Sequence, residues 1–226
     1  MNKSQRNVSF WNHYARLYDF EITKFSGHAY NQMYQNMKNV LSKGMRVLEI
    51  ATGTGLVAIN VAHHVHSIEA TDVSPKMIET AKRKILPDNI YFSIQDATTL
   101  AFNDNTFDAV IVSNALHIMP DPTKVLQSIS RVLKPNGLLI APNYTHGHIR
   151  ESSWKSTVRF LRLVGLDSYT RWTPDTYIEF IAQNGFLVNK REILSAAFPM
   201  VYLEAYKKDR SDTKLTSTAQ VNKGKK

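Results

Sequence analysis

The sequence predicts an α/β fold built on a doubly wound, mostly parallel sheet. Short apolar segments typical of buried strands alternate with helical segments from Met45 to about Pro142. The first of these strands breaks into a glycine-containing turn that leads directly into a helix. Four successive strands are each followed by polar residues, at the edge where open α/β sheets bind ligands. A chain of 226 residues is long enough for one such domain with a substantial core.

The segment before the sheet is predicted to form two helices. The second extends from about Tyr30 to Leu41. The first carries apolar and aromatic residues at helical spacing, namely Val8, Trp11, Tyr14, Ala15 and Tyr18. Together they form a helical cap over residues 4–42, ahead of a core at residues 44–142.

The most informative segment covers residues 47–55, with the sequence Val-Leu-Glu-Ile-Ala-Thr-Gly-Thr-Gly. An apolar strand carries Glu49 near its end, and the turn then includes Gly53 and Gly55. Glycine permits unusual φ angles and a backbone approach that a Cβ would block. A helix over Leu56–His64 follows, so main-chain N–H groups and a helix N-terminus would face a ligand. An ordinary βα turn is the alternative for this segment taken alone.

The second strand, Ser67–Thr71, ends at Asp72. Ser74 and Pro75 then begin a helix, as its N-cap and its first-turn proline. Asp72 lies roughly 20 residues after the glycine turn, where an acidic side chain binds the hydroxyls of a nucleoside ribose. A helix cap or a surface carboxylate is its alternative role.

Three further strands continue the alternation. Ile90–Ile94 leads to Asp96, and Phe107–Val112 leads to the polar residues around Asn114; Gly137–Ala141 is the fifth strand. An insert at residues 143–185 follows, with one amphipathic helix around Trp154 and a second that begins at Thr173-Pro174. The last two strands are Phe186–Ile193 and Pro199–Tyr206, within residues 186–206.

These ordered motifs resemble the class I S-adenosylmethionine-dependent methyltransferases, in particular their small-molecule, type 11 or ubiquinone-biosynthesis-like branch. The first family motif, acidic-x-Gly-x-Gly-x-Gly, aligns with residues 49–55, where Ala51 replaces the first glycine. The resemblance covers about Trp11 to Asn143. Its other matching segments are Asp72–Met77, Gln95–Ala97, Phe107–Val110, Leu116–Pro122 and Arg131–Gly137. A nicotinamide dehydrogenase is the alternative for this fold, but its Gly-x-Gly-x-x-Gly motif is absent.

The resemblance implies a Rossmann-like, seven-stranded sheet with one antiparallel strand, N-terminal helices and a helical lid insert. It also implies S-adenosyl-L-methionine as cofactor, S-adenosyl-L-homocysteine as product and in-line methyl transfer to a small-molecule acceptor. Glu49 and the turn would hold the methionine end, Asp72 the ribose, and Met77 with Asp96 and Ala97 the adenine. Tyr14 and Tyr18 resemble an aromatic pair that closes over the cofactor, although the same spacing also suits a core stripe. The implied cofactor residues are Tyr14, Tyr18, Glu49, Ala51, Thr52, Gly53, Gly55, Asp72, Val73, Met77, Asp96, Ala97, Ser113 and Asn114.

His117 follows the fourth strand, beside the expected position of the transferred methyl group. A general base is needed only if the acceptor carries a proton, and neutral imidazole suits that role. Tyr144 is the second candidate, and a structural position in the loop is the alternative for His117. The predicted substrate-binding residues are Trp11, His117, Tyr144, His146, Trp154 and Trp172. His63, His64 and His66 lack a matching set of carboxylates, so no metal site is expected.

Composition limits the possible functions further. The absence of cysteine excludes disulfides, thiolate metal sites and a cysteine nucleophile. No apolar run approaches the ~20 residues of a membrane span and no signal peptide is recognisable, so a cytoplasmic enzyme is expected. The strand end Ser113–Leu116 lacks the Asn/Asp-Pro-Pro-Tyr/Phe pattern used on adenine or glutamine nitrogens.

The net charge of +9 is concentrated at the C-terminus, where seven Lys and Arg residues but only two aspartates lie from Lys207 onward. We expect one domain over residues 1–209 and a disordered basic tail at 210–226. The expected partner is a small-molecule acceptor rather than nucleic acid. The basic tail could contact a membrane surface peripherally. The protein is expected to be a monomer or a homodimer. The alternatives are an RNA or protein methyltransferase that uses the tail and a non-catalytic cofactor-binding protein.

Overall fold

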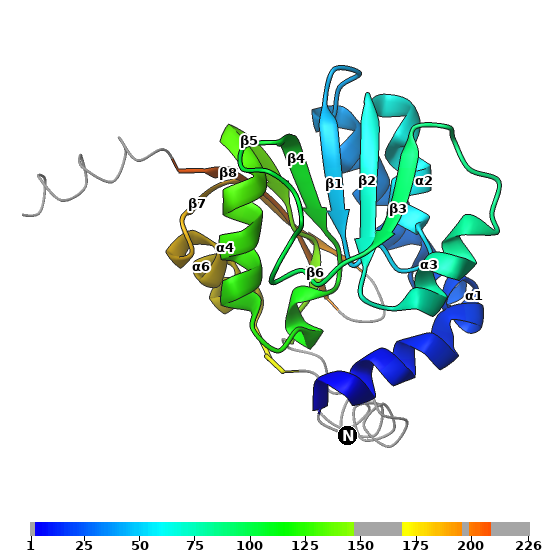
Figure 1. Cartoon of the computed structure of the whole chain (residues 1–226). Helices are drawn as coiled ribbons and strands as arrows, with labels where there is room; N and C mark the ends of the chain where they lie inside the picture. Colours follow the sequence, from blue (N-terminus) through cyan, green and yellow to red (C-terminus); the bar gives the residue numbers. More distant parts are fainter. Residues whose placement is uncertain (1–2, 147–168, 196–198, 209–226) are drawn as a thin grey trace, which may run out of the picture.

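The computed structural model describes residues 3–146, 169–195 and 199–208, with side chains for all of these except 3–6, 16–18 and 21–25. One twisted sheet forms its centre, and helices cover both faces of that sheet (Figure 1). Trp154, the side chain of Tyr18 and the tail at 210–226 lie outside the described part, so their predicted roles stay predictions.

The first five strands along the chain run parallel to one another. They are β1 (Arg46–Ile50), β2 (Ser67–Asp72), β3 (Ile90–Ile94), β4 (Phe107–Val112) and β5 (Leu133–Ile140). Their spatial order is β3-β2-β1-β4-β5. The order reverses between β1 and β4, and the carboxyl ends of strands at such a reversal form the usual ligand crevice of doubly wound sheets. The predicted fold class is therefore confirmed.

The predicted antiparallel strand is β8 (Met200–Lys207), which pairs with β5 on one side and with β7 (Phe186–Leu194) on the other. A two-residue strand, β6 (Asn143–Tyr144), also pairs with β8, beyond the end of β5. The sheet thus has the seven predicted strands and a short eighth one. Two residues are too few to show any periodicity, so the sequence could not predict β6.

β5 begins four residues before its predicted start at Gly137. Its first half contains Pro135 and the left-handed Asn136, with a φ angle of 56°. The pairing with β4 shifts register in this region. Proline cannot donate to a ladder and a left-handed residue interrupts the pleat, so the alternation of the sequence was weak here.

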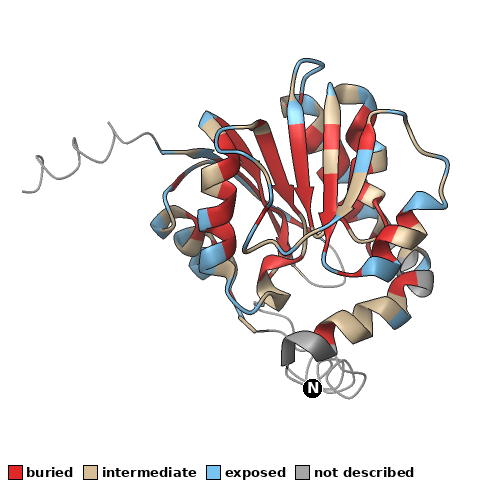
Figure 2. Ribbon diagram, in the orientation of Figure 1, coloured by how far each residue is buried: buried red, intermediate tan, exposed pale blue. Residues whose placement is uncertain are grey.

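The two faces of the sheet bury two separate apolar clusters. One contains side chains such as Val47 and Ile111 and packs against α1 (Lys3–Val40) and α2 (Leu56–Val61). The other contains alternate residues of the same strands, such as Leu48 and Val110, and packs against α4 (Pro122–Val132) and α6 (Pro174–Gln183). Buried residues therefore concentrate in the central strands (Figure 2). This double burial explains why the strands are continuously apolar.

Helix starts follow the local sequence closely. Ser74 caps α3 (Pro75–Lys82), as predicted, and accepts a hydrogen bond of 3.1 Å from Met77 N. Thr173 caps α6 with a reciprocal capping box to Thr176. Two short 3₁₀ helices complete the described elements, η1 (Ala62–His64) after α2 and η2 (Leu116–Ile118) after β4.

The prediction of two N-terminal helices was wrong, because residues 3–40 form the single helix α1. No proline interrupts this segment, and Gly27 has open space around its Cα. A glycine inside a helix costs only about 1 kcal/mol. Burial of residues such as Met33 and Met37 against the sheet stabilises the C-terminal half enough to offset that cost.

Candidate functional site

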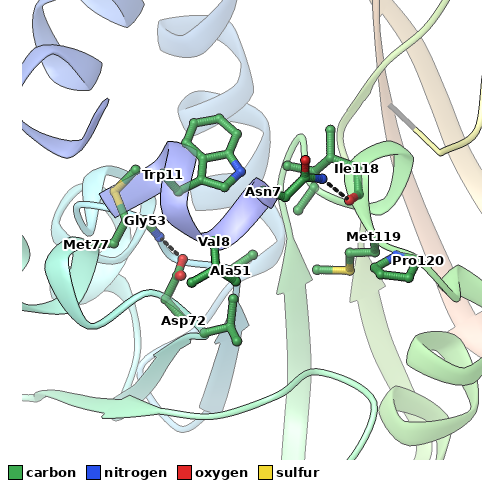
Figure 3. A pocket seen from close by; sticks show the side chains of 12 residues that line it. Asn7, Val8, Trp11, Ala51, Gly53, Asp72, Met77, Ile118, Met119 and Pro120 are labelled. Atoms are coloured by element: carbon green, nitrogen blue, oxygen red, sulfur yellow. Dashed lines mark hydrogen bonds between the residues drawn. The ribbon is translucent and has the colours of Figure 1, made fainter. Parts of the chain in front are cut away.

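A pocket lies at the carboxyl ends of β1, β2 and β4, beneath the N-terminal half of α1 (Figure 3). The helix contributes Asn7, Val8 and Trp11 to it. The opposite wall comes from the β1 turn, the end of β2, the start of α3 and the segment after β4. Those lining residues are Ala51, Gly53, Asp72, Val73, Met77, Ala115, Ile118, Met119 and Pro120. The pocket therefore forms at the strand ends where the sequence predicted a ligand site.

The turn after β1 adopts a backbone that side chains rarely allow. Ala51, Gly53 and Gly55 all have positive φ angles, of 53°, 57° and 78°. The turn is closed by a hydrogen bond of 2.9 Å from Gly55 N to the carbonyl of Thr52. Alanine at the first of these positions shows why the family motif prefers glycine there, since a Cβ in the left-handed region costs roughly 1–2 kcal/mol.

Glu49 is a buried carboxylate at the end of β1. It accepts a hydrogen bond of 2.7 Å from the Thr52 hydroxyl. Burial raises its pKa to about 8; the hydrogen bonds from Thr52 and the Ala58 backbone oppose this effect, and the nearby Asp72 adds to it. The protonated form is therefore the favoured one at neutral pH until a cation arrives.

Asp72 is held in a fixed orientation at the end of β2. Its Oδ2 accepts a hydrogen bond of 2.8 Å from Gly53 N, and its Oδ1 accepts one of 2.8 Å from Ser74 N. Burial raises the pKa of this carboxyl, and the same backbone bonds oppose the shift. An ionised carboxylate has about four acceptor positions, so two backbone bonds leave capacity for the two hydroxyls of a ribose.

Polar residues of α1 hold the helix over this edge. Asn12 Oδ1 accepts hydrogen bonds from Ser74 Oγ at 2.6 Å and from Lys76 N at 3.4 Å. Asp19 accepts a hydrogen bond from the hydroxyl of Thr54 and forms an ion pair of 2.5 Å with Lys84. The sequence analysis missed Asn12 and Asp19, because single polar residues on a helix show no pattern that points to a distant partner.

The other residues predicted to bind the cofactor fall into two groups. Val73 and Met77 line the pocket, as Asp72 does. Asp96 is exposed and accepts two hydrogen bonds from Thr98, both 2.8 Å long. Ala97 packs against the α4 side of the core. Asp96 and Ala97 are not among the residues that line the pocket, so contact with an adenine edge stays a prediction.

Ser113 and Asn114 follow β4, but neither is among the residues that line the pocket, so their contact with the cofactor stays a prediction. The Ser113 hydroxyl is 3.6 Å from the sulfur of Met33, and Asn114 Nδ2 donates to the hydroxyl of Tyr30 at 3.0 Å. Asn114 also has a positive φ angle of 52°. Both side chains therefore meet the C-terminal half of α1, and no pattern in the sequence indicated these contacts with Met33 and Tyr30.

Of the predicted aromatic pair, Tyr14 stacks on Phe10 with ring centroids 5.2 Å apart, and Trp11 lies next to both. Trp11 lines the pocket. Trp172 is 7 % exposed and packs on Tyr177 and Phe180 in the core on the α6 side. The structure thus places Trp172 in the hydrophobic core, and its role in acceptor binding stays a prediction.

The candidate base His117 lies in η2, with its Nδ1 3.0 Å from Asn143 Oδ1. The residue is half-buried, and desolvation of its ring by burial lowers its pKa to about 4. The other candidate, Tyr144, donates to Ser26 Oγ at 3.1 Å, and burial raises its pKa above the usual range. Burial also lowers the pKa of His146, and the backbone N–H of this residue donates to the carbonyl of Trp172 at 2.7 Å. At neutral pH, therefore, His117 can accept a proton and Tyr144 cannot.

The described residues contain no group of three or more His, Asp or Glu side chains that could hold a metal ion. Within those same residues, no helix has the length and apolar character that crossing a membrane requires.

Residues 48–141 match a family described as "Methyltransferase domain". A demethylmenaquinone methyltransferase of Renibacterium salmoninarum is 41 % identical over 103 residues, which cover 46 % of this chain and 43 % of that protein. A ubiquinone/menaquinone biosynthesis C-methyltransferase of Francisella philomiragia is 30 % identical over 152 residues, covering 63 % and 61 %. The chain therefore spans less than two thirds of the length of these relatives.

Solved structures share the fold at lower identity. A putative methyltransferase, solved in complex with the Haloferax volcanii Trm112 activator, superposes with a TM-score of 0.75 at 19 % identity, covering 88 % of this chain and 98 % of that one. A DhpI structure in complex with SAH gives a TM-score of 0.71 at 19 % identity, covering 91 % and 97 %. These likenesses show that other proteins share this fold.

Proposed function

We propose that this chain is an S-adenosylmethionine-dependent methyltransferase that transfers a methyl group to a small-molecule acceptor, because residues 48–141 match a methyltransferase domain and relatives of similar sequence are named methyltransferases. The observation that carries the proposal is the pocket at the carboxyl edge, where the left-handed turn and Asp72 meet beneath α1. The cofactor of the proposed reaction is S-adenosylmethionine, and a solved structure of the same fold was determined in complex with SAH.

The described residues fit such a cofactor by their chemistry. Asp72 keeps acceptor positions for ribose hydroxyls, and Met77 offers an apolar contact beside it. The turn at residues 51–55 brings the backbone close to the pocket without bulky side chains. Glu49, buried behind the turn, would ionise when an ammonium group binds nearby, and the positive charge of that group would offset the cost of burying the carboxylate.

When bound, this cofactor supplies an electrophilic methyl group on a sulfonium. The protein then has to position the acceptor and exclude water; alignment alone supplies roughly 7–11 kcal/mol of the barrier. Trp11, Ile118 and Met119 give the pocket an apolar wall suited to excluding water. His117 is the candidate to accept a proton from an acceptor that carries one, because its ring is neutral at pH 7.

The names of the curated relatives favour an acceptor with an apolar ring, since both describe quinone-pathway methyltransferases. The apolar wall of the pocket supports the same class. We therefore place demethylated quinols first among acceptors to test. A label-transfer assay with radiolabelled S-adenosylmethionine should compare quinols with small metabolites, lipids and RNA. Transfer to RNA that is lost when the tail is deleted would favour the alternative function.

The first prediction concerns cofactor affinity. Asp72→Ala removes an acceptor for two ribose hydroxyls, and each such charged bond contributes about 1.5–3 kcal/mol. Titration calorimetry with S-adenosylhomocysteine should therefore show at least a tenfold weaker Kd. Asp88→Ala, at an exposed aspartate that does not line the pocket, is the matched control and should bind like the wild type. Tight binding of a nicotinamide dinucleotide, with no binding of S-adenosylhomocysteine, would overturn the proposed function.

A further inference from the structure

The hydrogen bonds of Asn143 show which atom of its side-chain amide faces His117. This residue is completely buried in β6, and its Oδ1 lies 3.0 Å from Nδ1 of the His117 ring. Its Nδ2 donates a hydrogen bond of 3.0 Å to the carbonyl of Tyr144. If the amide were turned over, its oxygen would face that carbonyl oxygen, and two acceptors would repel each other. The oxygen of Asn143 is therefore the atom that meets the imidazole.

This contact sets the tautomer of His117. An amide oxygen only accepts hydrogen bonds, so Nδ1 of the ring is the nitrogen that carries the proton. In a neutral imidazole the lone pair then lies on Nε2. Burial lowers the pKa of His117 to about 4, the bond to Asn143 offsets part of this shift, and His146 adds to it. At pH 7 the ring is neutral and its proton acceptor is Nε2.

The turn that carries His117 is fixed on both sides. Its carbonyl accepts hydrogen bonds from Tyr169 N at 2.9 Å and from Thr170 N at 3.1 Å. The next carbonyl, that of Ile118, accepts one of 3.3 Å from Asn7 of α1 (Figure 3). Ile118 and Met119 line the pocket directly after His117. The imidazole is thus carried by a hydrogen-bonded segment whose next two residues line the pocket.

We propose that Asn143 is a positioning residue that holds His117 in the Nδ1-protonated tautomer, so that Nε2 is the general base for a proton-bearing methyl acceptor. This inference rests on the proposed function. The acceptor's X–H bond breaks and its proton forms an N–H bond at Nε2. The electron pair left on the acceptor makes the new bond to the methyl carbon, while the pair of the broken methyl–sulfur bond stays on sulfur. The ring, now an imidazolium, keeps its bond to Asn143 and later returns the proton to water.

An amide suits this position better than a carboxylate would. Among the described titratable groups, His146 is the neighbour that acts on His117, and Arg171 acts in turn on His146. An aspartate at position 143 would add a negative charge next to the ring and raise the pKa of His117. The neutral amide orients the ring and still leaves it unprotonated at physiological pH.

The first test observes the tautomer directly and needs neither cofactor nor activity. In protein labelled with ¹⁵N-histidine, long-range ¹H–¹⁵N correlation spectra report which ring nitrogen is protonated, and His117→Gln identifies the signals of His117. We expect a protonated Nδ1 and an unprotonated Nε2 for this residue from pH 6 to 8. A protonated Nε2, or an imidazolium at pH 7, would overturn the inference.

The second test follows the rate against pH in Asn143→Asp, which has nearly the same shape. The acid limb of kcat should move to higher pH by at least one unit, while the Kd for S-adenosylhomocysteine stays within twofold. Asn143→Leu should lower kcat by about 10²–10⁴, the usual contribution of a general base. An unchanged pH profile in Asn143→Asp rules out the base role. A wild-type protein that does not bind S-adenosylhomocysteine contradicts the proposed function instead and leaves the spectra to decide the tautomer.

Discussion

Glu49 and Asp72 lie close enough for the charge of Asp72 to raise the pKa of Glu49. Among the described residues, no Lys or Arg contributes to the pKa shift of either carboxylate, so a positive charge on a ligand would favour the ionised form of both. Burying a carboxylate without a cation is costly. A cationic ligand would therefore lower the free-energy cost of these two buried carboxylates, and that gain would add to its affinity. Titratable groups with shifted pKa values are common at functional sites.

The pH dependence of stability follows from Glu49. Its pKa rises from an ordinary 4.5 to about 8 on folding, so the folded state binds the proton more tightly and stability falls as pH rises through this range. His117 acts oppositely: its lowered pKa removes stability as pH falls from about 6.5 to about 4. Of these two groups, only Glu49 changes the stability between pH 6.5 and 8. Thermal unfolding should show Tm falling over this window in the wild type and not in Glu49→Gln.

The same residue predicts proton release on binding. A ligand with an ammonium group needs Glu49 ionised, so at pH 7 binding should expel up to one proton from the wild type. Calorimetry of S-adenosylhomocysteine in two buffers with different ionisation enthalpies measures this number. Glu49→Gln should release none, and equal proton release from this variant would show that another group is the source.

The backbone conformation of Ala51 leads to a prediction about the turn after β1. Its φ of 53° is tolerable for alanine but strained for a β-branched residue. Ala51→Val should destabilise the protein by roughly 1–3 kcal/mol and weaken cofactor binding, because its branches would also enter the pocket. Ala51→Gly is the matched control: relief of strain and added freedom of the unfolded chain nearly cancel. Chemical denaturation measures both, and a valine variant as stable as the wild type would show that this φ carries no strain.

At the scale of the elements, α1 joins two parts of the molecule. Its C-terminal half packs on the sheet through residues such as Met33, and its N-terminal half covers the pocket through Trp11. Among the described side chains, the N-terminal half is held by polar contacts, such as those of Asn12 with Ser74 and of Asp19 with Thr54, and Ala15 is its one buried hydrophobic residue. Segments with few buried apolar contacts open at low free-energy cost. Entry to the pocket is therefore expected through this half of the helix.

Asn12→Ala tests this division of α1. Loss of its bonds to Ser74 and Lys76 should raise hydrogen exchange around residues 7–15 and speed ligand release. Exchange around residues 29–40, which pack on the core, should not change. Gln32→Ala, which removes a bond to Glu192 in β7, is the control and should leave ligand release unaltered. A uniform rise along the whole helix would mean that α1 opens as one unit.

The sequence predicted the elements whose signals are local. The first strand, the cap at Ser74 and the start of α6 at Thr173 all follow from neighbouring residues. It did not predict the contact of Asn12 with Ser74 or that of His117 with Asn143, because each joins residues that are distant in sequence. The continuity of α1 was missed for the same reason, since packing on the sheet stabilises it. Of the pocket, the sequence therefore predicted the residues after β1 and β2 and Trp11 of α1. It missed the rest of the wall, namely Asn7, Val8, Ala115, Ile118, Met119 and Pro120.

For the whole molecule, the C-terminal segment gives a test of domain limits. Residues 211–226 are rich in Ser, Thr, Lys and Gln, and they contain too few apolar side chains to offset the entropy of ordering. Deleting them should leave Tm and the Kd for S-adenosylhomocysteine unchanged. A lower Tm would mean that this segment packs against the domain. Weaker, salt-dependent binding to anionic vesicles alone would assign it a contact with lipid surfaces.

The last strand of the domain, β8, occupies an interior place in the sheet between β5 and β7. During synthesis, therefore, β1 to β5 leave the ribosome before the strand that covers their open side exists. Until Met200–Lys207 emerges, β5 offers an unpaired apolar edge to any other nascent chain. Slow translation near the end of the message, or a chain cut before Met200, would prolong that exposure. Because of this strand order, the C-terminal part of the sequence affects the stability of the folded protein. It also affects how long the nascent chain depends on chaperones.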